Sequence, residues 1–479
     1  MTLFTRTTTK LAMVDFSNVS HSPVVGTKAG FWLECYDPFI QRLKMNNKKK
    51  ISLNRDIGQL GFAAIALNGV IGAGIFALPA VAAAKSGYFS PWLFLICAVL
   101  IMTVVLSFAR AASFFRETGG PIQYAGLAFG PFAGFQTGWL VYIGRLAAIG
   151  ANISLMVTYA GWFWAPLESG LGHQIAVAMT FVLLAVFNAV GVRQSMGVVF
   201  LFSALKLVPL FLLIVMGLAH IQPEILIQGK LPVTGTLGET VLILLYAFVG
   251  FESAVVPAGE ARNPRKDIPR AITITVLIIT GVYFLIQLIS VSVLPELADS
   301  KTPLADVAEV LIGASGAALL TLGAVFSIGG NCSASMLSAP RMTFALAKQG
   351  SLPAWFGEIH PRTRTPLNSI LFYAALGLVL ALSGSFIWLA VVSTLARLLS
   401  YILGVAALPI LEKKVEKSEN HFKLRGGYFV PGLALLLCLW LTTFASTTAW
   451  LTTAAFFALG SVLYLASSRN RENTDGSQQ

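Results

Sequence analysis

The sequence predicts an all-α polytopic membrane protein, and three observations support this fold class. Of the 479 residues, 56% are hydrophobic and only 11% are charged, which is too few charges for the surface of a soluble protein of this length. The hydrophobic residues form runs of about 20, the length that a helix needs to cross a hydrocarbon core of about 30 Å. Glycines interrupt two of these runs, and an interrupted helix inside a membrane requires a specific explanation.

Twelve hydrophobic runs predict twelve transmembrane helices joined by short connections. The runs lie near residues 57–84, 91–113, 133–160, 175–192, 197–220, 238–258, 271–294, 314–340, 367–384, 386–410, 430–446 and 448–466. They divide the chain into a polar N-terminal tail (1–50), a transmembrane domain (51–468) and a polar C-terminal tail (469–479). Met45 opens directly onto the basic segment that precedes the first span, so translation from Met45 is an alternative start.

Basic residues orient the spans, because cytoplasmic loops accumulate Lys and Arg. With both termini cytoplasmic, only three of the 33 Lys and Arg fall in outer loops: Lys85, Lys230 and Lys301. Three more lie within spans: Arg145, Lys206 and Arg397. The net charge of +12 is then explained by topology and by contact with anionic lipids, and nucleic acid is not expected as a partner. The expected location is the bacterial inner (plasma) membrane.

Three glycines interrupt the first span, in the stretch Gly69-Val70-Ile71-Gly72-Ala73-Gly74-Ile75-Phe76. A helix broken inside a membrane leaves backbone N–H and C=O groups unpaired, and only protein, water or a ligand can satisfy them there. Half-helix N-termini present N–H groups to a carboxylate, while unwound carbonyls can hold an ammonium. The stretch is therefore a candidate site for a small zwitterion.

A second interruption lies in the sixth span, at Tyr246-Ala247-Phe248-Val249-Gly250-Phe251-Glu252-Ser253, with Pro257 one turn later. Alone, each glycine-containing stretch would indicate close helix packing. Their matching positions in two five-helix halves instead favour a binding site at the interface of inverted repeats, as in secondary transporters.

Several motifs between residues 55 and 466 fit one pattern. They are Gly72-Ala73-Gly74-Ile75-Phe76 with Pro79, residues 119–124, residues 248–272, residues 349–353 and residues 407–409. Together they resemble amino acid permeases of the amino acid/polyamine/organocation superfamily. The resemblance implies a leucine-transporter-like fold: a 5+5 inverted repeat plus two peripheral helices, with the first and sixth helices unwound at mid-membrane.

The resemblance also implies a substrate site between the two interruptions. Its expected residues are Val70, Ile71, Gly72, Ala73, Gly74, Ile75, Tyr246, Ala247, Phe248, Val249 and Gly250. By position, the N–H groups of residues 72–74 would face the substrate carboxylate, and carbonyls of Val70, Tyr246 and Val249 would face the amine. Many family members carry a serine at the position of Ala73, so carboxylate binding here would depend on the backbone alone.

Lys206 and Glu252 are the candidate proton-coupling residues. Lys206 lies roughly 13 Å from the cytoplasmic end of its span, where desolvation disfavours a permanent charge. In proton-coupled permeases of the family, a fifth-helix lysine stands in place of a sodium ion. Both residues also have a structural interpretation: Lys206 would bond to freed carbonyls, and Glu252 would form a fixed pair with Arg145, Arg397 or Lys206. For Glu252 the fixed pair is favoured.

Four polar residues within spans are candidate pocket or gate residues: Asn152, Asn331, Ser335 and Tyr401. Asn152, Asn331 and Ser335 are equally able to bond one helix to another. Tyr401 matches a gating tyrosine in the arginine/agmatine antiporter of the superfamily, but a helix-packing tyrosine is the favoured interpretation. That antiporter closes over its substrate with an eighth-helix tryptophan, which residues 329–336 lack, so an arginine specialist is not expected. Neutral amino acids are favoured, while the excess of positive charge inside the spans leaves an acidic substrate open.

Catalysis is not expected, because no catalytic residue set, metal-ligand spacing or cofactor motif is found. The five histidines lie in the tail or near loops, and the four cysteines are scattered. The expected function is proton-coupled uptake of a neutral amino acid by alternating access. The alternatives are amino acid/amine exchange (antiport) and a non-transporting sensor on the same scaffold. The expected partners are an amino acid, protons and membrane lipids.

Overall fold

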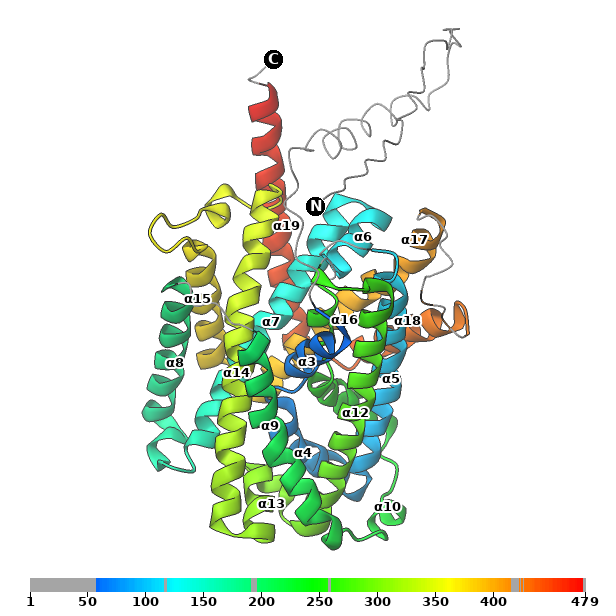
Figure 1. Ribbon diagram of the computed structural model, residues 1–479, viewed down its shortest axis with the longest axis vertical. Helices are drawn as coiled ribbons and strands as arrows, with labels where there is room; N and C mark the ends of the chain where they lie inside the picture. Colours follow the sequence, from blue (N-terminus) through cyan, green and yellow to red (C-terminus); the bar gives the residue numbers. More distant parts are fainter. Residues whose placement is uncertain are drawn as a thin grey trace, which may run out of the picture. The chain divides into compact units, whose positions relative to one another are not determined.

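The computed structural model describes residues 57–476, except 116–118, 191–195, 257–259, 415–421, 423 and 425. Within these ranges the chain is helical and contains no β-strand (Figure 1). Nine of the described helical segments are long and apolar enough to cross a membrane, and three shorter apolar helices accompany them. The predicted all-α class is therefore confirmed for the described residues, and the apolar helices are consistent with a polytopic membrane protein. Met45 and the N-terminal tail lie outside the described residues.

The long helices of the described chain follow the predicted hydrophobic runs. They are α3 (Gln59–Val70), α4 (Gly74–Ser86), α5 (Ser90–Ala112), α7 (Pro131–Ala160), α8 (Gly170–Val190), α9 (Met196–Gly217), α11 (Thr234–Leu244), α12 (Pro264–Val293), α14 (Ala314–Lys348), α15 (Leu367–Ser383), α16 (Phe386–Ala406), α18 (Phe429–Thr442) and α19 (Thr447–Gly476). Shorter helices lie in the connections: α6 (Pro121–Phe129), α10 (Ile225–Gln228), α13 (Pro303–Ile312) and α17 (Leu408–Lys414). The helix α14 continues eight residues beyond the predicted end at 340, and Pro340 lies inside it.

Helix α7 lies at the centre of the described bundle, and α8 and α19 lie at its periphery. In the most apolar part of each helix, 83% of the α7 residues are buried, against 17% in both α8 and α19. Helix α7 packs against α14, α15 and α16 (Figure 1). An apolar helix that the protein leaves uncovered must face lipid, so α8 and α19 supply part of the outer surface of the membrane domain.

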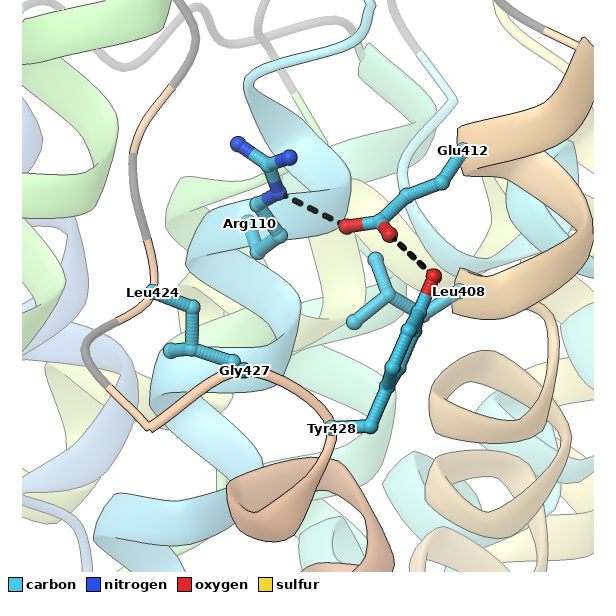
Figure 2. Close-up of a pocket in the computed structure, with 6 residues that line it drawn as sticks. All are labelled: Arg110, Leu408, Glu412, Leu424, Gly427 and Tyr428. Carbon is cyan, nitrogen blue, oxygen red and sulfur yellow. Dashed lines mark hydrogen bonds and ion pairs between the residues drawn. The ribbon is translucent and has the colours of Figure 1, made fainter.

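The C-terminal helices are joined to α5 by a small polar cluster beside a cavity of about 260 Å³ (Figure 2). Arg110 Nε, near the end of α5, donates to Glu412 Oε1 of α17 at 3.0 Å. The Tyr428 hydroxyl donates to Glu412 Oε2 at 2.6 Å. No residue of either predicted interruption lines this cavity. The cluster is partly exposed, and it provides a comparison for the buried charges described below.

Candidate substrate and coupling site

The first predicted interruption separates α3 from α4. Helix α3 ends at Val70, Ile71 is extended (φ −76°, ψ 95°), and α4 begins at Gly74. No hydrogen-bond partner for the N–H groups of Gly72, Ala73 or Gly74 is found in the described part of the chain. All three residues are buried. Helix α4 therefore presents consecutive unpaired donors at its N-terminus, the end that favours negative charge.

The second predicted interruption follows α11. A 3₁₀ turn, η4 (Leu245–Ala247), leads to Gly250, which has a left-handed φ of 114°, and a second 3₁₀ segment, η5 (Phe251–Ala254), follows. The carbonyl groups of Val70, Tyr246 and Val249 accept no hydrogen bond from any described residue. Unpaired donors of one break and unpaired acceptors of both breaks thus lie within the described core.

The two interrupted segments lie directly against each other, with α3 packed on η5 and α4 on α11. A Cβ atom added to Gly74 would lie 2.7 Å from Ala247 Cα. One added to Gly250 would lie 2.3 Å from the carbonyl oxygen of Gly69. Only glycine permits these backbone approaches, and Gly250 also needs its positive φ. The glycines therefore bring the two breaks together as well as ending the helices.

Lys206 of α9 reaches the first break. Its side chain is fully buried, and Nζ donates to Asn68 Oδ1 at 2.5 Å and to the carbonyl oxygen of Ile71 at 2.8 Å. The lysine therefore contacts a freed carbonyl, as its structural interpretation requires, and it also joins the fifth span to the first, as the family resemblance implies. Asn68 was not among the predicted residues. Its position directly before Gly69, inside an apolar run, is the sequence signal that would have indicated it.

A chain of hydrogen bonds continues from Asn68 to the second break. Asn331 Nδ2 of α14 donates to the Asn68 carbonyl at 2.9 Å. Asn152 Nδ2 of α7 donates to Asn331 Oδ1 at 3.0 Å, and the Tyr246 hydroxyl donates to Asn152 Oδ1 at 2.6 Å. The amide of Asn331 would lie 3.4 Å from a Cβ atom on Gly72. Two predicted pocket residues therefore lie beside the first break and contact each other.

The other predicted side chains face different directions. Ser335 shares a 2.8 Å hydrogen bond with Tyr373 of α15, so it lies at a contact between helices. Phe248 is fully buried, and its ring packs edge-to-face on Tyr283 of α12, with ring centres 5.3 Å apart. Tyr246 faces Asn152. Of the two aromatic residues in the second break, Tyr246 is the one that lies with the polar groups.

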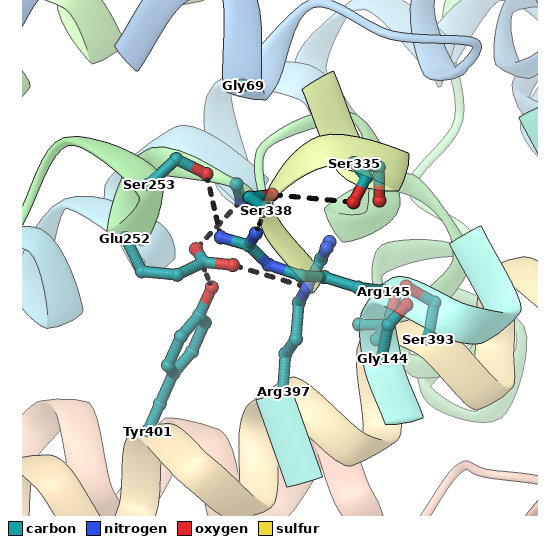
Figure 3. A network of polar contacts seen from close by, with 12 residues as sticks. Gly69, Gly144, Arg145, Glu252, Ser253, Ser335, Ser338, Ser393, Arg397 and Tyr401 are labelled. Carbon is teal, nitrogen blue, oxygen red and sulfur yellow. Dashed lines mark hydrogen bonds and ion pairs between the residues drawn. The ribbon is translucent and has the colours of Figure 1, made fainter. Parts of the chain in front are cut away.

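Glu252 and Tyr401 belong to a buried polar cluster (Figure 3). Glu252 Oε2 accepts hydrogen bonds from the Tyr401 hydroxyl at 2.8 Å and from the Gly250 N–H at 3.0 Å. Glu252 Oε1 lies 3.3 Å from Arg397 Nε. Among the three basic partners considered from the sequence, Arg397 is the one within ion-pair distance, while Arg145 bonds to serine hydroxyls.

Interrupted helices that lie against each other in an apolar helical bundle are a feature of transporter folds. The chain belongs to the amino acid permease family, whose family model matches residues 57–471. The predicted family is thereby confirmed.

Three relatives illustrate the similarity. The chain is 29% identical to the serine/threonine exchanger SteT of Bacillus subtilis over 428 residues, which cover 86% of this chain and 92% of that protein. It is 26% identical to the branched-chain amino acid permease BcaP of the same organism over 459 residues, covering 90% and 96%. It is 30% identical to an uncharacterized transporter of Mycobacterium tuberculosis, covering 69% and 74%.

Proposed function

We propose that this permease is a secondary active transporter that moves a neutral amino acid across the membrane by alternating access. The observation that carries the proposal is the set of unpaired backbone groups at the two breaks. The N–H groups of residues 72–74 suit a carboxylate at the N-terminus of α4. The carbonyls of Val70, Tyr246 and Val249 suit an ammonium. An α-amino acid carries both groups on one carbon.

The neutral substrate is supported by the chemistry of the site and of the relatives. Tyr246, Asn152 and Asn331 offer uncharged polar groups beside the first break. The two relatives with named substrates, a serine/threonine exchanger and a branched-chain amino acid permease, both handle amino acids with uncharged side chains. Their names also support both modes of transport, exchange and permeation, so antiport is the second candidate, ahead of a non-transporting sensor.

The architecture that we propose is a 5+5 inverted repeat of twelve spans. Two spans are interrupted, the one formed by α3 and α4 and the one formed by α11, η4 and η5. Helices α18 and α19 are the two peripheral spans. The transmembrane domain covers residues 51–468, between cytoplasmic tails at 1–50 and 469–479. The charge distribution supports this orientation in the bacterial inner membrane.

For coupling, we propose that Lys206 carries the transported proton. The protonated amine holds the end of α3 through Asn68 and the Ile71 carbonyl, and loss of the proton weakens both contacts. Glu252 is the second candidate, but its three partners already favour a fixed carboxylate.

Proteoliposome uptake tests these proposals together. Labelled serine, threonine, leucine, glutamate and arginine are supplied with and without an inward proton gradient, and with and without unlabelled amino acid inside. Accumulation driven by the gradient alone supports proton symport. Uptake only into preloaded vesicles supports exchange. Saturable binding without either form of uptake would favour a sensor, and absence of both binding and uptake for all amino acids would refute the proposed substrate class.

A further inference from the structure

The buried charges of the described chain do not balance. Four charged side chains are buried: Arg145, Lys206, Glu252 and Arg397. Three are basic and one is acidic. Lys206 lies apart from the rest and bonds to neutral oxygens of α3. The two guanidinium groups of Arg145 and Arg397 therefore have one carboxylate between them, and a guanidinium inside a membrane protein is costly without a counter-charge.

Glu252 cannot neutralise both arginines. Its Oε2 atom is occupied by the Gly250 N–H and the Tyr401 hydroxyl. Its Oε1 atom lies 3.3 Å from Arg397 Nε, yet neither atom makes a hydrogen bond, so the pair lacks the geometry of a fork-shaped contact. Arg145 bonds only to hydroxyl groups, with Ser338 at 2.6 Å and Ser253 at 3.1 Å.

The two arginine side chains approach each other from different helices. Arg145 extends from α7 and Arg397 from α16, and both reach toward the Glu252 carboxylate (Figure 3). Both are more than nine-tenths buried. Two guanidinium groups beside one carboxylate repel each other in a low dielectric, and an additional negative charge beside them would offset this repulsion. The packing of α7 and α16 therefore places the two arginines together inside the protein.

We propose that Arg145 and Arg397 form a binding site for one small monovalent anion. The Arg397 guanidinium makes no hydrogen bond with any described residue, and its contact with Glu252 is a 3.3 Å ion pair; the anion would neutralise the charge that Glu252 leaves uncompensated. Two anions have the required chemistry: a halide from the solution and the side-chain carboxylate of an acidic amino acid. The site lies next to both breaks, because Ser253, which holds Arg145, would contact a Cβ atom on Gly69 at 3.2 Å. Its occupancy should therefore stabilise the contact between α3 and η5.

The test is a thermal-stability titration of the purified full-length protein, so it does not depend on transport. The midpoint is measured in a buffer whose only anion is a bulky sulfonate such as HEPES, with chloride, bromide, glutamate or glutamine added at constant pH and ionic strength. We expect a saturable upward shift of the midpoint with chloride and bromide. A shift with glutamate alone, and not with glutamine or halide, would assign the anion to the substrate side chain. No saturable shift with any anion overturns the proposal.

Variants locate the effect. Arg397→Gln should abolish the anion-dependent shift, and Arg397→Lys should retain a weaker one because it keeps the charge but loses the fork. Arg110→Gln is the matched control, since Arg110 also pairs with a glutamate but lies outside the cluster (Figure 2). An anion response that is unchanged in Arg397→Gln refutes the site. If Arg397→Gln does not fold, Arg397→Lys decides the question, because a response equal to that of the parent refutes the site. Uptake measured on the same preparation separates failure of this proposal from failure of the transport proposal.

Discussion

Gly74→Ala should separate the two interrupted helices. The new methyl group would lie 2.7 Å from Ala247 Cα, 2.9 Å from Ala247 Cβ and 3.2 Å from Ala247 N. Carbon atoms pack at about 3.5–4.0 Å, so α4 or η4 must move by roughly 1 Å. Two of these three atoms are backbone, and no side-chain rotation relieves the clash. Overpacking of this kind costs about 1–3 kcal/mol of stability.

The same displacement should weaken substrate binding. It moves the N–H groups at the start of α4 away from the carbonyls of the second break, and a loss of about 1.4 kcal/mol in binding free energy is a tenfold loss of affinity. We therefore expect a lower thermal midpoint and at least about a tenfold higher dissociation constant. The assay is ligand binding by purified protein at matched folded concentration, with the midpoint measured alongside.

Gly281→Ala is the control for this experiment. Gly281 lies inside α12, and a Cβ atom there meets nothing within 4 Å. Alanine should leave binding unchanged and stabilise the helix by about 0.5–1 kcal/mol. If Gly74→Ala binds substrate and melts like the parent protein, the close contact between α4 and η4 is absent from the binding-competent state, and the proposed site is wrong.

Three further predictions concern side chains around the breaks. Lys206→Ala should lose gradient-driven accumulation and the pH dependence of uptake while retaining measurable binding; accumulation equal to the parent's would direct the search to Glu252. Tyr246→Phe should raise the half-saturation concentration about 2- to 10-fold, the worth of one hydrogen bond, and an unchanged value would remove Tyr246 from the pocket. Phe248→Ala should lower stability by about 3–5 kcal/mol, seen in thermal melts, with unchanged affinity of the folded fraction; lost affinity would contradict its packing role.

The helical class and the course of the hydrophobic runs could be predicted from the sequence, because composition and hydrophobic run length are local properties. The direction of each side chain at the second break could not. Helical periodicity assigns directions only while the chain is helical, whereas residues 245–254 pass through two 3₁₀ segments and a left-handed glycine. The two aromatic residues therefore point to different neighbours: Phe248 packs against α12, and Tyr246 contacts Asn152.

The sequence also could not predict which residues pair with one another in the polar clusters. One glutamate and three basic residues within spans were visible, but the partner of Glu252 depends on how α16 and η5 pack, which no local pattern contains. The same limit applies to Asn68. Its side chain and its carbonyl oxygen accept hydrogen bonds from α9 and α14, two helices that are distant in the sequence.

Lys206 and the substrate carboxylate would act on opposite ends of the same peptide group. The carbonyl that Lys206 binds belongs to Ile71, and the amide on the other side of that peptide bond is the N–H of Gly72, which is unpaired in the described chain. A charged donor on the carbonyl polarises the peptide unit and makes its N–H a stronger donor. Protonated Lys206 should therefore tighten carboxylate binding, and by linkage the two binding events favour each other. Apparent substrate affinity should then fall as the pH rises. In Lys206→Met the affinity should not change with pH, and a pH profile in that variant equal to the parent's would refute this coupling.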